Sequence, residues 1–123
     1  MAQAFLLVFI GGGAGSVLRY ALALGLPKGA AGTFPLATLA ANTAGCLLIG
    51  LLLATLERRG AGAPALLLVT GFCGGFTTFS TFSADTLRLM RDGTHAAAFF
   101  YMALTLAGGL LCTAAGKALA KLL

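Results

Sequence analysis

Charged residues divide the chain into four long apolar runs. No Lys, Arg, Asp or Glu occurs in residues 1–18, 29–56, 60–84 and 93–116, which are runs of 18, 28, 25 and 24 residues. A helix that crosses the hydrocarbon core of a bilayer needs about 20 mostly apolar residues, so each run can hold one span and none comfortably holds two. The pattern therefore predicts an all-α integral membrane protein with four transmembrane helices, at about 3–25, 34–56, 64–91 and 95–120.

Short turns join the predicted helices. The turns are Pro27-Lys28-Gly29, residues 57–64 and Arg91-Asp92-Gly93, and they leave no room for a soluble domain. We therefore expect a single membrane domain over residues 1–123. A cleaved signal peptide is the alternative for the first run, but such a peptide begins with positive side chains, which residues 1–3 lack.

Composition supports a membrane protein and excludes several other classes. Hydrophobic residues make up 59% of the 123 residues and charged residues 9%, against about 25% charged in ordinary soluble domains. The mean hydropathy of +1.00 also excludes a disordered chain. The net charge of +5 does not indicate a nucleic-acid partner, because the basic residues lie at helix ends and form no large cluster.

The distribution of positive charge gives little preference for one orientation. Four spans place both termini and the 57–63 turn on one face, and each face then carries four basic residues. They are Arg58, Arg59, Lys117 and Lys121 on that face, and Arg19, Lys28, Arg88 and Arg91 on the other. Weak bias permits insertion in both orientations, and hence an antiparallel dual-topology homodimer. A single fixed orientation with weak bias is the alternative.

The middle of the third run has an unusual composition. The 13 residues from Gly71 to Ser83 contain 3 Gly, 4 Phe, 5 hydroxyl residues and one Cys. Gly74-Gly75 followed by Thr77-Thr78 is poor helix material. We expect the third helix to be broken near its centre.

A broken helix leaves backbone groups without partners, at a cost of roughly several kcal/mol for each group in hydrocarbon. Broken membrane helices can use the freed carbonyls to hold a small cation. A monovalent cation at the carbonyls of Gly74 and Thr77 is one solution. Buried water, or back-bonding by the hydroxyls of Thr77 and Thr78, is the other.

Aromatic and hydroxyl residues alternate after the expected break. Phe79 and Phe82 are three apart and share a helix face, with Ser80 and Thr81 between them. The edge of a benzene ring is positive, so ring edges turned into a narrow polar path would favour a small anion. Simple packing of the two rings is the alternative.

Polar residues in the first two spans allow two interpretations each. Asn42 lies one helical turn after Thr38 and could make a helix–helix hydrogen bond or donate to a permeating ion. Arg19, late in the first span, could snorkel to the interface or form an electropositive mouth for anions. In the fourth span, one face carries a possible polar track with a gap at Gly109; its members are Tyr101, Thr105 and Thr113.

Several functions lack the residues that they require. Glu57, Asp85 and Asp92 fall at or near the ends of the predicted spans, whereas a proton-coupled exporter normally needs a carboxylate near a span centre. The three cysteines are widely spaced and form no metal or redox motif. No nucleophile, base and orienting group come together, so we do not expect an enzyme.

Taken with these motifs, the chain resembles the bacterial fluoride channel family known as Fluc or CrcB. The matching segments are Gly71 to Ser83, Gly11-Gly12-Gly13 through Arg19, and Leu39-Ala40-Ala41-Asn42. They cover three of the four spans in order. The resemblance implies passive export of cytoplasmic fluoride through a multi-pass protein of the bacterial inner membrane, which lowers fluoride toxicity.

The resemblance also implies roles for individual residues. It implies an antiparallel homodimer with two fluoride pores and a structural sodium ion at its centre, held by the carbonyls of Gly74 and Thr77. Phe79 and Phe82 would line the pore, Asn42 would donate to fluoride and Arg19 would lie in the vestibule. Other pathway residues would be Ser80, Thr81, Thr38, Tyr101, Thr105 and Thr113. The competing functions are a small dual-topology multidrug/proton exporter and a non-transporting accessory subunit.

Overall fold

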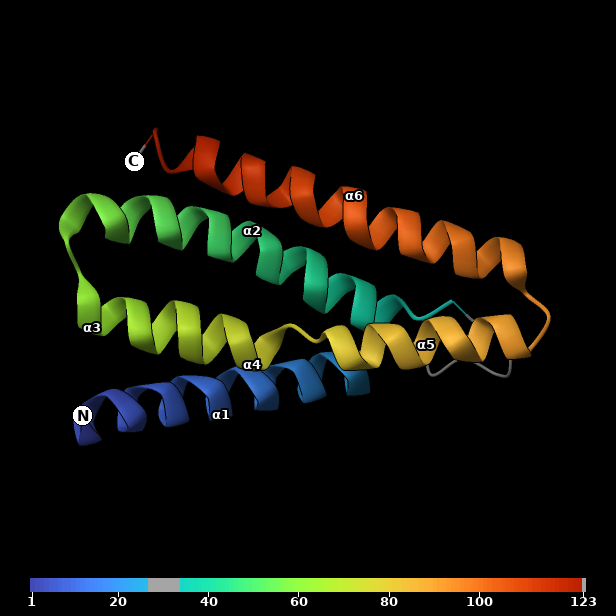
Figure 1. Cartoon of the computed structure of the whole chain (residues 1–123), viewed down its shortest axis with the longest axis horizontal. Helices are drawn as coiled ribbons and strands as arrows, with labels where there is room; N and C mark the ends of the chain where they lie inside the picture. The colour runs from blue at the N-terminus through green and yellow to red at the C-terminus, as the bar shows by residue number, and fades with distance from the viewer. Residues whose placement is uncertain (27–33, 123) are drawn as a thin grey trace.

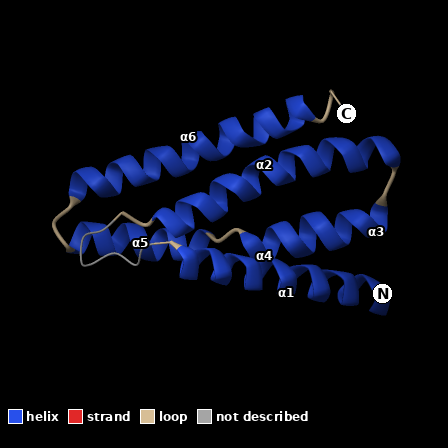
Figure 2. Cartoon of the chain, turned by 180° about the vertical axis from the view of Figure 1, so that it is seen from behind, coloured by secondary structure: helices blue, strands red, loops and turns tan. Residues whose placement is uncertain are grey.

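Residues 1–26 and 34–122 are described by the computed structural model, and every regular element in these ranges is a helix (Figure 2). The elements are α1 (Ala2–Gly25), α2 (Leu36–Arg59), α3 (Gly62–Ala65), the π-helix η1 (Leu66–Cys73), α4 (Gly74–Phe76), α5 (Phe79–Arg91) and α6 (His95–Leu119). Four helices are long and apolar enough to cross a bilayer: Ala2–Gly25, Leu36–Arg59, Gly62–Arg91 and His95–Leu119. The four predicted apolar helices are confirmed, and none of their ends differs from the predicted position by more than three residues. The predicted turn at residues 27–29 lies outside the described residues.

The four long helices lie lengthwise beside one another (Figure 1). α2 packs mainly on α6, and α1 packs mainly on η1 and α4. Both chain ends and the turn between α2 and α3 lie at one end of the molecule, and the turn between α5 and α6 lies at the other (Figure 1). This arrangement agrees with the expectation that the two termini share one face.

Glycines allow the helices to approach closely. A Cβ on Gly11, Gly15 or Gly75 would overlap backbone atoms of the facing helix in the α1–third-span contact. Gly50 and Gly116 have the same role between α2 and α6. Small residues at such contacts bring two backbones together, which is a main source of packing energy between helices in lipid.

The third span is interrupted, and the interruption falls on two threonines. α4 ends at Phe76, Thr77 and Thr78 have extended backbone with ψ of 159° and 115°, and α5 begins at Phe79. The short loop is visible between α4 and α5 in Figure 1. Gly74 keeps helical angles (φ −61°, ψ −38°). The expected break therefore occurs just after the glycine pair, and Gly75 serves close packing against α1.

Candidate functional site

Asn42 of α2 replaces the helical hydrogen bonds that the interruption removes. The backbone N–H of Thr78 donates to Asn42 Oδ1 at 2.8 Å, and Asn42 Nδ2 donates to the Thr78 carbonyl at 3.2 Å. One side-chain amide thus satisfies both backbone groups of one residue, as a neighbouring peptide would. The helix–helix bond that the sequence allowed is confirmed. The amide carries two N–H donors, and the second makes no hydrogen bond to another described residue.

The threonine hydroxyls also satisfy local backbone. Thr77 Oγ1 donates to the Cys73 carbonyl at 2.9 Å, which is the back-bonding alternative stated for the break. Thr78 is the N-cap of α5, and its Oγ1 accepts from the Thr81 N–H at 3.2 Å. Thr78 Oγ1 also lies 3.0 Å from Thr81 Oγ1 and 3.2 Å from Ser80 Oγ. The interrupted segment is therefore held by a series of hydrogen bonds between its hydroxyl and backbone groups.

Arg19 points at the interrupted span. Its Nε donates to the Gly75 carbonyl at 3.3 Å, and Ser16 Oγ donates to the same oxygen at 3.3 Å. The sequence allowed Arg19 either to snorkel to the interface or to form an electropositive mouth. In the structure its half-buried guanidinium is hydrogen-bonded to the third span from the side of α1. It places positive charge within one helical turn of the break.

The carbonyls of Gly74 and Thr77 differ from that of Gly75. Neither accepts a hydrogen bond from another described residue, whereas Gly75 accepts two. Gly74 is exposed, with open space where a Cβ would be. Within the described ranges no group of three His, Cys, Asp or Glu side chains could hold a metal. Carbonyl oxygens that accept no hydrogen bond are ligands of the kind that hard cations take.

Phe79 and Phe82 are neighbours but lie in different environments. Their ring centroids are 5.6 Å apart at an interplanar angle of 44°. Phe82 is 8% exposed and its ring lies 5.3 Å from that of Tyr101, whereas Phe79 is 76% exposed. Of these two rings, that of Phe82 belongs to the packed core of the chain and that of Phe79 does not.

Two hollows flank the break. The larger, of about 250 Å³, brings together four of the predicted pathway residues with others that the sequence did not single out as such, among them Cys46, Ile49 and Leu106. Its lining is Asn42, Cys46, Ile49, Thr77, Thr78, Phe79, Phe82, Thr105 and Leu106. The smaller, of about 100 Å³, is lined by Arg19, Tyr20, Ala23, Ala37, Thr38, Thr78 and Thr81. Thr78 lines both hollows, so the interrupted backbone stands between them. Ser80, Tyr101 and Thr113 line neither.

The three polar residues predicted along the fourth span differ in the hydrogen bonds that their hydroxyls make. Tyr101 is fully buried, with its ring edge-on to Phe34 at 5.5 Å. The hydroxyl oxygens of Tyr101 and Thr105 are both buried. The Tyr101 hydroxyl interacts with the Thr38 and Asp85 side chains, whereas that of Thr105 has no hydrogen-bond partner among the described residues. Thr113 Oγ1 donates to the Gly109 carbonyl of its own helix at 2.9 Å. Of these three hydroxyls, that of Thr105 is therefore the one without a partner in the described part of the chain.

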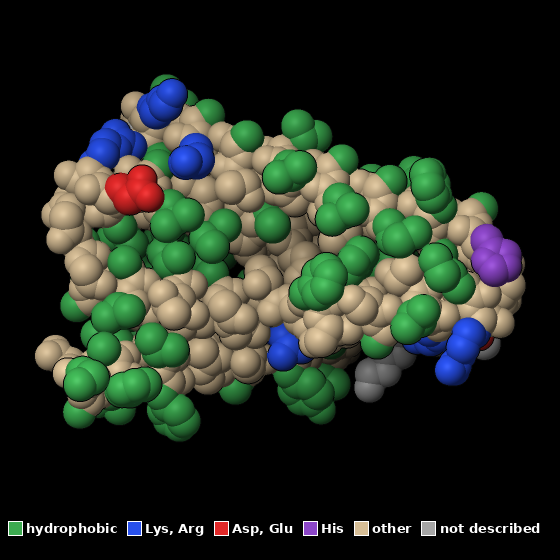
Figure 3. Space-filling model, viewed as in Figure 1, with side chains coloured by type: hydrophobic (Ala, Val, Ile, Leu, Met, Phe, Trp, Pro, Cys, Tyr) green, Lys and Arg blue, Asp and Glu red, His purple; other side chains and the backbone are tan. Residues whose placement is uncertain are grey.

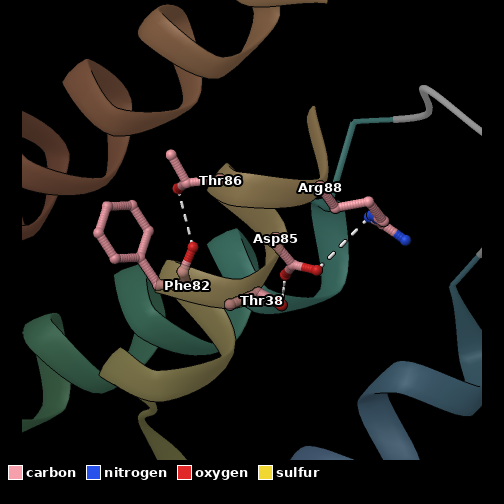
Figure 4. A network of polar contacts seen from close by, with 5 residues as sticks. All are labelled: Thr38, Phe82, Asp85, Thr86 and Arg88. Atoms are coloured by element: carbon pink, nitrogen blue, oxygen red, sulfur yellow. Dashed lines mark hydrogen bonds and ion pairs between the residues drawn. The ribbon is translucent and has the colours of Figure 1, made fainter. Parts of the chain in front are cut away.

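Asp85 was expected at or near the end of the third span. It lies in the last two turns of the Gly62–Arg91 helix, with a side chain 16% exposed. Thr38 Oγ1 donates to its Oδ2 at 2.7 Å, and Arg88 Nη2 lies 3.4 Å from its Oδ1 (Figure 4). Within the same helix, Thr86 Oγ1 donates a hydrogen bond to the Phe82 carbonyl at 2.8 Å. The spacing of Asp85 and Arg88 was the available sequence signal for the ion pair; the link to Thr38 had none.

Hydrophobic side chains cover much of the length of the molecule on the face shown in Figure 3, and most of the Lys, Arg, Asp and Glu side chains lie toward its two ends. One end holds Arg58 and Arg59 in the last turn of α2 and Lys117 in the last turn of α6. Basic side chains at helix C-termini interact favourably with the helix dipole and with lipid headgroups. The surface is that of a multi-pass membrane protein.

These features define a class: a small four-helix membrane protein whose third span opens into a polar, hydroxyl-rich interruption. The chain belongs to the CrcB-like family, since the family model described as "CrcB-like protein, Camphor Resistance (CrcB)" matches residues 6–117. Two relatives, each described as a fluoride-specific ion channel FluC, come from Chlorobaculum tepidum and Flavobacterium psychrophilum. They are 52% and 46% identical over 119 and 116 residues, which cover 95% and 93% of this chain and 94% of each relative.

Proposed function

We propose that this protein is a fluoride-selective channel of the bacterial inner membrane that lets cytoplasmic fluoride leave down its electrochemical gradient. The observation that carries the proposal is the 46–52% identity to fluoride-specific channels over nearly the whole chain. The chemistry agrees: a small, strongly hydrated anion needs hydrogen-bond donors to replace its water. The fluoride relatives and the donors around the break do not support a multidrug/proton exporter, and the proposed role is transport without catalysis.

The pathway that we propose runs along the break. Asn42 and Thr105 line the hollow with Phe82, and each has an N–H or O–H group without a hydrogen-bond partner among the described residues. Tyr101 stays a proposed pathway residue, and its hydroxyl interacts with Thr38 and Asp85. The ring edges of Phe82 and Phe79 would add weak positive potential between these donors. Arg19 would raise the local concentration of anions at the smaller hollow, which it lines with Thr38 and Thr81. Ser80 and Thr113 stay proposed pathway residues with less geometric support.

An antiparallel homodimer would complete the path. Gly74 and Phe79 are exposed on one chain although they belong to the interrupted span. A second copy that packs there would cover the exposed ring and double the number of carbonyl oxygens near the break. The equal number of basic residues on the two faces permits such a pair.

The free carbonyls of Gly74 and Thr77 support a structural sodium ion at the centre of that dimer. A bound cation would offset the dipoles of the carbonyls and hold the two breaks together. The ion is proposed only as a structural component, and it does not contact fluoride in this scheme.

Efflux from liposomes tests the channel proposal. Purified protein is reconstituted into vesicles loaded with potassium fluoride or potassium chloride, and valinomycin is added so that potassium balances the charge. Rapid fluoride release with chloride release at the level of protein-free vesicles is expected. No fluoride release by a folded dimer would contradict the proposal, as would equal release of both anions.

The sodium proposal needs a separate measurement. Protein purified in sodium-free buffer with a large organic cation should form fewer dimers and conduct less fluoride, and added sodium should restore both. Full dimer formation and flux after complete sodium removal, confirmed by elemental analysis, would exclude a structural role for the ion.

A further inference from the structure

Cys46 faces the same hollow as the proposed fluoride donors. It lies one helical turn after Asn42 on α2, and residues four apart share a helix face. Both line the hollow of about 250 Å³ that also includes Thr105 and Phe82. The proposed pathway gives this cysteine no role.

Gly109 of α6 lies directly opposite the thiol. It occupies the position at which the series of Tyr101, Thr105 and Thr113 lacks a side chain. A Cβ built on Gly109 would lie 3.3 Å from Cys46 Sγ, which is closer than ordinary contact. The sulfur of α2 therefore fills the space that a side chain of α6 would need.

The donors of α6 end at this point. Thr105 lines the hollow, and its hydroxyl oxygen is buried without a hydrogen-bond partner among the described residues. One turn beyond Gly109, the hydroxyl proton of Thr113 is committed to the Gly109 carbonyl at 2.9 Å. Besides Asn42, Thr77, Thr78 and Thr105, the lining of the hollow includes one more side chain with a donor, the thiol of Cys46. A thiol is a weak S–H donor and is small.

We propose that Cys46 contacts the permeating fluoride and continues the donor series from Asn42 and Thr105 across the gap at Gly109. The inference rests on the proposed function, in that fluoride must cross this hollow. A neutral thiol suits the position because it offers a proton without a negative charge that would repel the anion.

Chemical modification tests the placement of the thiol. In a Cys73→Ala/Cys112→Ala background, Cys46 is the only cysteine, and the reconstituted channel is treated with methyl methanethiosulfonate. The thiolate attacks the reagent sulfur, a disulfide-linked methylthio group forms and methanesulfinate leaves. Fluoride efflux should fall to the level of protein-free vesicles and return after reduction with dithiothreitol. The same background with Cys46→Ala should not respond to the reagent.

Three results would overturn the inference. One is full fluoride flux when mass spectrometry shows complete modification of Cys46. Another is a thiol that reacts in denatured protein but not in the conducting channel, since it would then lie outside the water-accessible path. Absence of fluoride flux in the untreated wild type would remove the proposed function and this inference with it, and so is distinguishable from the other two.

Substitution of Cys46 in the otherwise unchanged chain tests the donor role with Cys73 and Cys112 in place. Cys46→Ser keeps a small donor and should conduct fluoride at least as fast as wild type. Cys46→Ala loses the donor and should conduct about fivefold more slowly, the factor expected for one net hydrogen bond. Equal flux in wild type, Cys46→Ser and Cys46→Ala, with all three dimeric, would mean that the sulfur only fills space.

Discussion

Thr38 Oγ1 of α2 donates a 2.7 Å hydrogen bond to Asp85 Oδ2 of α5. This bond joins the start of the second span to the half of the third span that follows the interruption, where direct contact between α2 and α5 is otherwise sparse. Arg88 lies 3.4 Å from the other carboxylate oxygen and offsets its charge (Figure 4). The pair thus fixes the position of α5, and with it Phe82, relative to α2.

Removal of the Asp85 carboxylate should loosen that link. Asp85→Ala leaves the Thr38 hydroxyl without its acceptor, and a partly buried orphan donor costs about 1–3 kcal/mol. We expect a lower midpoint of thermal unfolding in detergent, whereas Asp85→Asn, which keeps an acceptor oxygen, should lose much less. Thr38→Val with Asp85→Ala completes a double-mutant cycle. Strictly additive losses would show that the hydrogen bond contributes nothing.

Asn42→Asp tests the Asn42 amide as a donor to fluoride, and it also removes the N–H bond to the Thr78 carbonyl. The carboxylate can still accept from the Thr78 N–H, but it loses both N–H donors and adds negative charge beside the proposed path. The variant should therefore fold and dimerise while fluoride flux falls by about tenfold or more, as expected for loss of a charge-assisted donor bond. Thr55→Ala on the same helix, which removes only a hydroxyl bonded to the Leu51 and Leu52 carbonyls, is the matched control and should conduct normally. Normal flux through Asn42→Asp would exclude Asn42 as a donor to fluoride.

Much of the architecture could be predicted because the bilayer imposes it. The four apolar runs and their separating charges predict the four helices, since only a helix satisfies its own backbone across lipid. The exact position of the break does not follow from local sequence, because glycine and threonine are both poor helix formers. The break falls on Thr77-Thr78, where Asn42 of another span bonds the freed backbone groups, and no local pattern reveals that partner.

The same limit applies to the site. Asn42, Phe82 and Thr105 could be named from residue type and position, and the structure brings them to one hollow. Cys46 was set aside because a single thiol in an apolar helix has no distinguishing spacing. Its proximity to Gly109 is a property of the contact between α2 and α6, which sequence periodicity alone does not define.

Substitution of Phe79 and of Phe82 should change the stability of the protein to different extents but should reduce fluoride flux in both cases. Phe82→Ile removes part of a buried ring and should destabilise the protein by about 1 kcal/mol, whereas Phe79 is exposed in one chain and Phe79→Ile should not. Both variants should form dimers and lose fluoride flux, because Ile has no positive ring edge. Phe99→Ile on α6, another exposed ring, serves as the control in the same efflux assay and should conduct like wild type. Undiminished flux in both Phe79→Ile and Phe82→Ile would rule out the ring-edge contribution.

Gly75 and Gly74 are adjacent but should respond in opposite ways to the same substitution. A Cβ on Gly75 would overlap the Gly12 carbonyl, so Gly75→Ala should push α1 from the third span and reduce the yield of folded protein. A Cβ on Gly74 meets open space, so Gly74→Ala should leave the helical content and the unfolding midpoint of the chain unchanged. Circular dichroism and thermal melts compare the two variants directly. If Gly74→Ala folds but no longer gives a sodium-dependent dimer, the exposed glycine is needed at the contact between two copies; if it unfolds like Gly75→Ala, the described packing of α4 is wrong.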